Sequence, residues 1–187
     1  MRLLTLTGTG GVGKTRLAIQ VARDVAGLFP DGVAFASLAP LGDATLVLPT
    51  VVQVLGLREV RGRTPGEVLQ AHLQEKEFLL ILDNFEHVME AAPEVAELNQ
   101  YCSNLAILVT SRAPLHIRGE QEYPVQPLAL PASTRSPELE EVVGSPSGRL
   151  FVERARAASP AFELTGANTT AVASICWRLA GIPLALE

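Results

Sequence analysis

Eight consecutive residues near the start of the chain constrain its fold more than any other feature. Gly8 to Thr15 read GTGGVGKT, which matches the pattern G-x-x-x-x-G-K-[ST]. An apolar run at residues 3–7 precedes the pattern, and apolar residues at helical spacing follow it: Leu17, Ala18, Val21, Ala22 and Val25. Glycines let backbone N–H groups converge on phosphate oxygens, and a helix start adds positive potential. The pattern therefore predicts a phosphate-binding loop between a buried strand and a helix.

The same loop predicts which residues hold a nucleoside triphosphate and its metal. We expect Lys14 to neutralise the β- and γ-phosphates and the Thr15 hydroxyl to join the Mg²⁺ shell. The other candidate nucleotide contacts are Gly8, Thr9, Gly10, Gly11, Val12, Gly13 and Arg16. The alternative is a glycine-rich turn with a surface lysine, and the strand–loop–helix context argues against it.

A second group of candidates follows the strand predicted at residues 78–83. Its sequence, FLLILD, is apolar without alternation, which is typical of a parallel strand covered on both faces. A buried carboxylate needs a partner, so we assign Asp83 to the magnesium ion, with capping of the next turn as the alternative. Asn84 can orient water but cannot accept its proton. Glu86 or His87 could substitute, or neither could have a catalytic role, and the sequence predicts slow hydrolysis.

A candidate phosphate sensor follows the apolar strand predicted at residues 105–110. Arg112 comes at the carboxyl end of that strand, the edge at which open α/β sheets bind ligands. Because a guanidinium binds phosphate oxygens in a fixed fork, we expect Arg112 to contact the γ-phosphate. A solvated arginine is the alternative, and Arg118 is a weaker candidate for the same role.

Strand and helix signals alternate from residue 2 to about residue 127, which predicts an α/β fold with a parallel sheet. Beyond the strands already named, we expect strands at residues 33–38 and 123–126. Helices are expected at residues 44–57, 65–74 and 93–102, the second of them capped by Thr64 with Pro65 at its first position.

The composition changes after this alternating region. Residues 131–148 are rich in Pro, Ser, Glu and Gly, and we expect an interdomain linker there. A helix is predicted from Pro146 to about residue 158, and another follows Asn168. We therefore divide the chain into a P-loop domain at 1–131, a linker at 132–145 and the start of an all-helical domain at 146–187.

Composition and charge exclude several classes of protein. The net charge is −5, with 15 Lys+Arg against 20 Asp+Glu, which argues against a nucleic-acid clamp or a polybasic membrane binder. No apolar run approaches the ~20 residues of a transmembrane helix. The two cysteines, Cys102 and Cys176, make no disulfide framework and fit a reducing compartment, so we expect a cytoplasmic protein with both thiols in its core.

Five segments in order resemble the STAND class of P-loop ATPases, the NB-ARC-like group. In particular, the chain resembles the nucleotide-binding module of large bacterial signalling ATPases and of LuxR- or SARP-type regulators. The segments that carry the resemblance are LLTLTGTGGVGKTRLA, FLLILDNFEHV, LAILVTSRAPL, GEQEYPVQPLALP and CWRLAGIPLALE.

The resemblance implies a sheet of order 2-3-4-1-5 followed by a helical domain, with ATP or ADP and Mg²⁺ as ligands. It implies that residues 181–184 correspond to the family's GLPL motif, which makes Pro183 a candidate adenine contact. Other parts of such proteins, namely a winged helix, repeats and effector domains, are the expected partners of this segment. On its own, the segment is expected to be a monomer.

These features lead to three functional hypotheses. The first is an ATP/ADP-dependent conformational switch with weak ATPase activity, serving signal transduction or transcription regulation. The second is a non-hydrolysing interaction scaffold that retains ADP. The third is a small-molecule kinase, which needs an acceptor-binding lid with arginines, whereas the segment after Arg112 is short and leads into the predicted linker.

Overall fold

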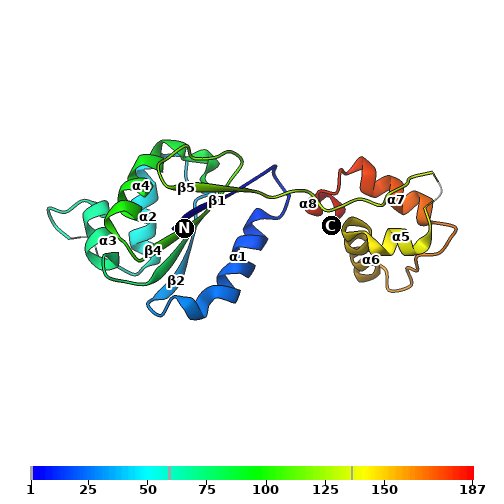
Figure 1. Ribbon diagram of the computed structural model, residues 1–187, viewed down its shortest axis with the longest axis horizontal. Helices are drawn as coiled ribbons and strands as arrows, with labels where there is room; N and C mark the ends of the chain where they lie inside the picture. The colour runs from blue at the N-terminus through cyan, green and yellow to red at the C-terminus, as the bar shows by residue number, and fades with distance from the viewer. Residues whose placement is uncertain (1, 59, 136) are drawn as a thin grey trace. The chain divides into compact units, whose positions relative to one another are not determined.

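The computed structural model describes residues 2–58, 60–135 and 137–187 (Figure 1). The chain divides into two compact units. Unit 1 comprises the residues up to Gly8 together with residues 14–124. Unit 2 comprises residues 9–13, which belong to the glycine-rich loop, and residues 125–187.

Unit 1 is built on a sheet of five parallel strands. The strands are β1 (Leu3–Thr7), β2 (Gly32–Ser37), β3 (Phe78–Asp83), β4 (Leu105–Ser111) and β5 (Glu120–Pro124). Their order is β2-β3-β4-β1-β5, and each neighbouring pair is parallel. Every residue of β3 is buried, as its continuous apolar sequence predicted. The predicted fold class and strand order are confirmed.

Helices of unit 1 cover both faces of this sheet (Figure 1). They are α1 (Lys14–Val25), α2 (Val47–Val54), α3 (Pro65–Leu73) and α4 (Ala92–Tyr101), with 3₁₀ turns η1 (Ala26–Leu28), η2 (Ala44–Leu46), η3 (Phe85–His87) and η4 (Met89–Ala91). Leu80 and Leu82 of β3 pack into one core cluster with α2, α3 and α4. Right-handed crossovers in this strand order put α1 on the opposite face, under Leu79 and Ile81.

Local signals set the start of α3 where it was predicted, whereas the helix expected at residues 44–57 consists of turn η2 followed by α2, which ends at Val54. The Thr64 hydroxyl accepts from the Glu67 N–H at 3.2 Å, and the Glu67 carboxylate accepts from the Thr64 N–H at 2.7 Å. This reciprocal capping box, with Pro65 at the first helical position, begins α3. The helix predicted at residues 93–102 is α4, preceded by the short turns η3 and η4.

The last strand differs from its prediction. We expected it at residues 123–126, and β5 spans Glu120–Pro124. This strand pairs only with β1 at the edge of the sheet, so most of it is exposed and it carries no buried apolar run. Its start is fixed by the Glu120 carboxylate, which accepts from the Leu115 and His116 N–H groups, each at 2.8 Å.

Unit 2 contains four helices among its described residues: α5 (Leu139–Gly144), α6 (Pro146–Ala158), α7 (Thr169–Arg178) and α8 (Pro183–Leu186). The predicted linker at 132–145 therefore includes helix α5, and its Val142 is fully buried in the core of this unit. The Ser145 hydroxyl accepts from the Gly148 N–H at 3.1 Å and caps α6, as expected. Asn168 stands at the N-cap of α7, but its side chain bonds Thr165 and Glu163 instead of the helix.

The cysteines and the surface follow the expected pattern. Cys102 and Cys176 are both fully buried, and burial raises the pKa of each thiol, so both are core residues as predicted. Trp177 is not a core residue: it is half exposed and donates its indole N–H to the Pro131 carbonyl at 2.9 Å.

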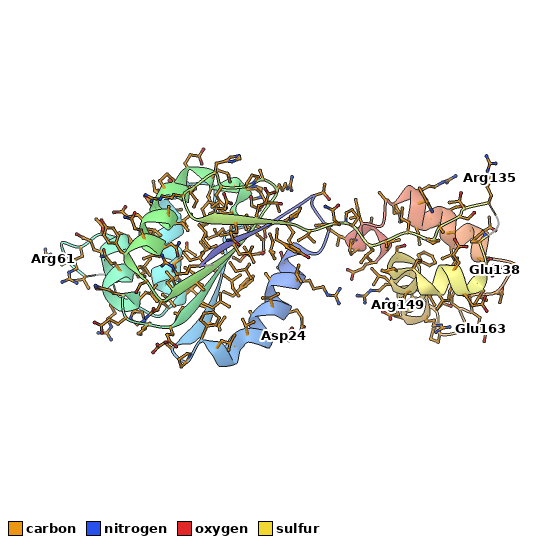
Figure 2. All side chains as sticks on the ribbon, in the orientation of Figure 1. Asp24, Arg61, Arg135, Glu138, Arg149 and Glu163 are labelled. Carbon is orange, nitrogen blue, oxygen red and sulfur yellow. The ribbon has the colours of Figure 1, made fainter. Side chains whose placement is uncertain are left out.

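Figure 2 shows charged side chains such as Asp24 and Arg61 projecting from unit 1. No helix in the described parts of the chain is long and apolar enough to cross a membrane.

Candidate functional site

The glycine-rich loop leaves β1 at Thr7 and leads into α1, which begins at Lys14. Gly11 and Gly13 have φ values of 78° and 103°, a region that side-chain-bearing residues rarely adopt. At Gly11 a Cβ would also lie 2.9 Å from Leu184 Cβ, within unit 2. The loop therefore requires glycine for its backbone conformation at both positions, and for close packing at Gly11.

Lys14 is buried at the end of this loop, with 8% of its surface exposed. Its ammonium donates a hydrogen bond to the Gly8 carbonyl at 2.7 Å. Burial lowers the pKa of Lys14 and nearby Arg112 lowers it further, while the carboxylates of Glu86 and Asp83 oppose the shift. The site thus holds a desolvated cation at a loop whose glycines suit close approach by phosphate oxygens.

Asp83 and two threonines form the centre of the site. The Thr15 hydroxyl donates to Asp83 Oδ1 at 2.7 Å, and the Thr110 hydroxyl donates to the same oxygen at 2.6 Å. Hydroxyl and carboxylate oxygens are hard ligands that suit Mg²⁺, so Thr15 and Asp83 fit the predicted metal. The described residues contain no cluster of three or more His, Cys, Asp or Glu side chains suited to a metal. A magnesium ion here would need phosphate and water oxygens to complete its shell, and it would supply positive charge at the phosphates.

Thr110 was missed by the sequence analysis. It is the buried residue before the last of β4, beside β3, and its hydroxyl both donates to Asp83 and accepts from the Asn84 N–H at 3.0 Å. The signal that could have identified it is a hydroxyl residue at the carboxyl end of the strand that pairs with the aspartate-bearing strand.

We expect Thr110→Val to destabilise unit 1 by about 1–3 kcal/mol, because it removes a bond to a buried carboxylate and leaves the Asn84 N–H without a partner. Thr110→Ser keeps the hydroxyl and is the matched control. It should lose much less free energy of unfolding than the valine variant. Urea unfolding followed by circular dichroism measures both. Equal stability of the valine variant and the wild type would contradict this role.

Arg112 and Glu86 meet at the same edge of the sheet. Arg112 Nε lies 3.1 Å from Glu86 Oε1, and the arginine side chain is 63% exposed whereas the glutamate side chain is 11% exposed. Asn84, which follows Asp83, has left-handed backbone angles, φ 63° and ψ 49°. His87 and Arg118 are both exposed. The structure thus brings Lys14, Asp83, Glu86 and Arg112 together within unit 1.

The remaining predicted residues lie near the ends of helices. Arg16 is exposed in the first turn of α1. Pro183 begins α8, and the N–H of the next residue, Leu184, donates to the Gly11 carbonyl at 3.2 Å, within unit 2. This bond places Pro183 one residue from a contact with the glycine-rich loop.

Two cavities of about 310 and 520 Å³ lie elsewhere, at helices α2, α3 and α4. Pro49 and Pro65 line both cavities, and none of the predicted site residues lines either. These cavities do not take part in the site described above.

The sheet order and the loop, lysine and aspartate at its edge define a P-loop NTPase fold, of the kind found in STAND-like ATPase modules. The NB-ARC domain family matches residues 1–117, and the chain belongs to this family.

Relatives and solved structures agree with this assignment. Proteins of Mycobacterium tuberculosis and Mycobacterium bovis that carry the provisional name of HTH-type transcriptional regulator are 40% identical over 187 residues. The match covers 100% of this chain and 20% of each relative, so the chain spans about a fifth of their length. An uncharacterized Mycobacterium tuberculosis protein is 33% identical, with 44% of its length covered.

Three archaeal structures share the fold at low sequence identity. A Walker-type ATPase of Pyrococcus abyssi has a TM-score of 0.60 at 15% identity, covering 98% of this chain and 60% of that one. The Aeropyrum pernix ORC2 protein has a TM-score of 0.57 at 16% identity, and the match covers 98% of this chain and 52% of that one. A STAND protein of Pyrococcus horikoshii with a tetratricopeptide repeat sensor has a TM-score of 0.55 at 16% identity, and the match covers 99% of this chain and 26% of that one.

Proposed function

We propose that this chain binds ATP and ADP and acts as a slowly hydrolysing conformational switch in signal transduction or transcription regulation. The observation that carries the proposal is the pairing of a buried Lys14 at the glycine-rich loop with the Thr15–Asp83 hydrogen bond at the neighbouring strand end. A polyphosphate with bound magnesium needs a cation for its phosphates and oxygen ligands for its metal. Lys14 offers the first, and the Thr15 hydroxyl and the Asp83 carboxylate offer the second.

In this proposal the loop residues 8–13 and Lys14 bind the phosphates, and Thr15 and Asp83 hold Mg²⁺. Arg16 contacts the nucleotide from the first turn of α1. Pro183 contacts the adenine, as the family resemblance implies, and the bond from Leu184 to Gly11 supports a position near the loop.

The switch depends on a group that distinguishes ATP from ADP. Arg112 uses Nε to bind Glu86, and its two terminal nitrogens are the donors that a γ-phosphate would engage. Since only ATP offers that phosphate, ATP and ADP would favour different states, and their difference in affinity sets the shift in population. We propose that ADP keeps the P-loop domain (1–131) and the helical domain (146–187) closed across the linker (132–145), and that ATP reorients them.

The names of the 40% identical relatives support an output in transcription, through domains outside this segment. We propose a winged helix, repeats and an effector domain as those partners. The acidic segment itself would bind no nucleic acid and no membrane. It would act in the cytoplasm, and alone it would be a monomer.

Steady-state phosphate release tests the catalytic part of the proposal. Many ATPases that hydrolyse quickly carry a second carboxylate directly after the metal-binding aspartate, whereas Asn84 stands there and cannot accept a proton. A base from any other position is expected to support only slow turnover, below ~1 per second and under the ordinary range of enzymes. Faster turnover would contradict the proposed switch. ADP retained through purification with no phosphate release at all would favour the non-hydrolysing scaffold instead.

Arg112→Ala tests the sensor. We expect the affinity for a non-hydrolysable ATP analogue to fall about 10-fold, because charge-assisted bonds to the γ-phosphate are lost, while ADP affinity changes less than about 2-fold. Arg118→Ala removes an exposed arginine from the same loop and is the matched control. Calorimetric titration measures all four affinities. An equal loss for both nucleotides would contradict the sensor role.

A further inference from the structure

The carboxylate of Glu86 is only half satisfied. Its Oε1 accepts from Arg112 Nε at 3.1 Å. Its Oε2 is buried and has no hydrogen-bond partner in the described part of the chain, and the side chain is 11% exposed. Buried polar atoms nearly always have a partner, so an unpartnered carboxylate oxygen marks a place where a ligand or water donates a hydrogen bond.

The surroundings of Glu86 connect this oxygen to the phosphate site. Glu86 lies in turn η3, which follows β3 and its Asp83, and Arg112 directly follows the neighbouring strand β4. The carboxyl ends of parallel strands meet at one edge of a sheet, and at this edge Asp83 also accepts the Thr15 hydroxyl from the start of α1. The unpartnered oxygen therefore belongs to a carboxylate at the same edge as the residues expected to hold the phosphates and the metal.

The backbone explains why this carboxylate does not come directly after Asp83. Asn84 has left-handed angles, which asparagine tolerates and which cost most other residues about 1–2 kcal/mol. Its N–H donates to Thr110, and the next side chain, Phe85, is fully buried and anchors turn η3. Asn84 thus allows the chain to turn after β3, and the turn η3 carries Glu86 at the carboxyl edge of the sheet.

We propose that Glu86 is the catalytic carboxylate that polarises the attacking water, an inference that rests on the nucleotide binding proposed above. The water oxygen forms a bond to the γ-phosphorus, and the bond from that phosphorus to the bridging oxygen breaks, its electron pair leaving on ADP. The proton of the water passes to Glu86 Oε2 and from there to solvent. Arg112 holds the other carboxylate oxygen and so leaves Oε2 for the water.

The test is the E86Q variant, which keeps the shape and removes the base. Single-turnover hydrolysis of radiolabelled ATP is expected to slow at least about 100-fold, the lower end of general-base effects. Affinities for ATP and ADP are expected to stay within about 3-fold of wild type. Affinity for ADP with aluminium fluoride, which mimics the transition state together with its water, is expected to fall with the rate. The matched control is E90Q, which removes the same charge from the exposed Glu90 of turn η4 and should hydrolyse ATP at the wild-type rate.

Several outcomes would overturn the proposal, and they differ from failure of the proposed function. A wild type that binds no nucleotide would contradict the proposed function itself. A wild type that binds ATP without hydrolysing it would overturn the role of Glu86 together with the slow hydrolysis in the proposed function. An E86Q variant that hydrolyses at the wild-type rate would overturn the role of Glu86 alone. A rate lost in N84G but kept in E86Q would assign the water to Asn84. If E86Q does not fold, E86D decides: a rate unchanged from wild type contradicts the proposal, since the shorter carboxylate would no longer reach the water.

Discussion

Lys14→Ala is expected to lower the affinity for ATP and for ADP at least about 100-fold, or about 2.7 kcal/mol. The substitution removes the only buried ammonium seen in the described residues, at the loop that the glycines shape for phosphate. Charge-assisted hydrogen bonds to phosphate oxygens are among the strongest in proteins, and a desolvated site strengthens them further. Calorimetric titration with each nucleotide in the presence of Mg²⁺ measures the loss.

The same variant separates binding from folding. Burial lowers the pKa of Lys14, which means that folding disfavours the charged form of this side chain. Urea unfolding of the variant, followed by circular dichroism beside the titration, shows whether it is folded, so that lost affinity is not attributed to unfolding. Lys76→Ala, which removes the other lysine of the chain, is the control and should bind nucleotide as the wild type does. Undiminished affinity in Lys14→Ala would reject the site.

Phe85→Ala is expected to cost about 3–5 kcal/mol of the free energy of unfolding of unit 1, the usual loss for a large aromatic removed from a core. Phe85 is fully buried in the main core cluster and is among the largest buried side chains. It follows Asn84 and precedes Glu86, so its packing also fixes the turn that carries Glu86 to the site. Urea unfolding followed by circular dichroism measures the change.

Phe35 provides the comparison for this prediction. It lies on β2 at the sheet edge and is 37% exposed, so Phe35→Ala should cost about 1–2 kcal/mol, in proportion to the smaller apolar area lost from the interior. Similar losses in the two variants would mean that the core does not hold the turn after β3 in the way the structure indicates.

The sequence predicted the fold well where the signals are local and strong. The glycine-rich loop, the apolar strand ending at Asp83 and the Thr64–Pro65 start of α3 each combine a residue pattern with a backbone requirement. Continuous apolar strands alternating with helices specify a parallel sheet, and the family resemblance supplied the strand order.

What the sequence did not predict depends on contacts between distant residues. The partnership of Thr110 with Asp83 needs the register of β4 beside β3, which no local pattern encodes. Edge strand β5 is polar and exposed, so periodicity placed it three residues late. Helix α5 is short and lies in a Pro- and Ser-rich segment, where its one buried residue, Val142, gave no periodic signal.

In the candidate site too, residues with a local sequence signal were predicted, and residues that depend on distant contacts were not. Lys14, Thr15 and Asp83 were predicted because motif and context fix their chemistry, and Glu86 was left as one of several alternatives. The interest of Glu86 depends on its ion pair with Arg112, which follows the neighbouring strand, and on its buried, unpartnered oxygen. Contacts of this kind join residues that lie 26 positions apart in the sequence, which the local pattern does not reveal.

Calorimetric titration of the wild-type chain with ADP and with adenosine, both with Mg²⁺, tests the central claim most directly. If the loop at Gly8–Thr15 grips a polyphosphate, ADP should bind with one site per chain and adenosine at least about 100-fold more weakly, because the phosphates carry the charge-assisted bonds. Adenosine that binds as tightly as ADP, or an ADP titration without saturable heat, would contradict the claim.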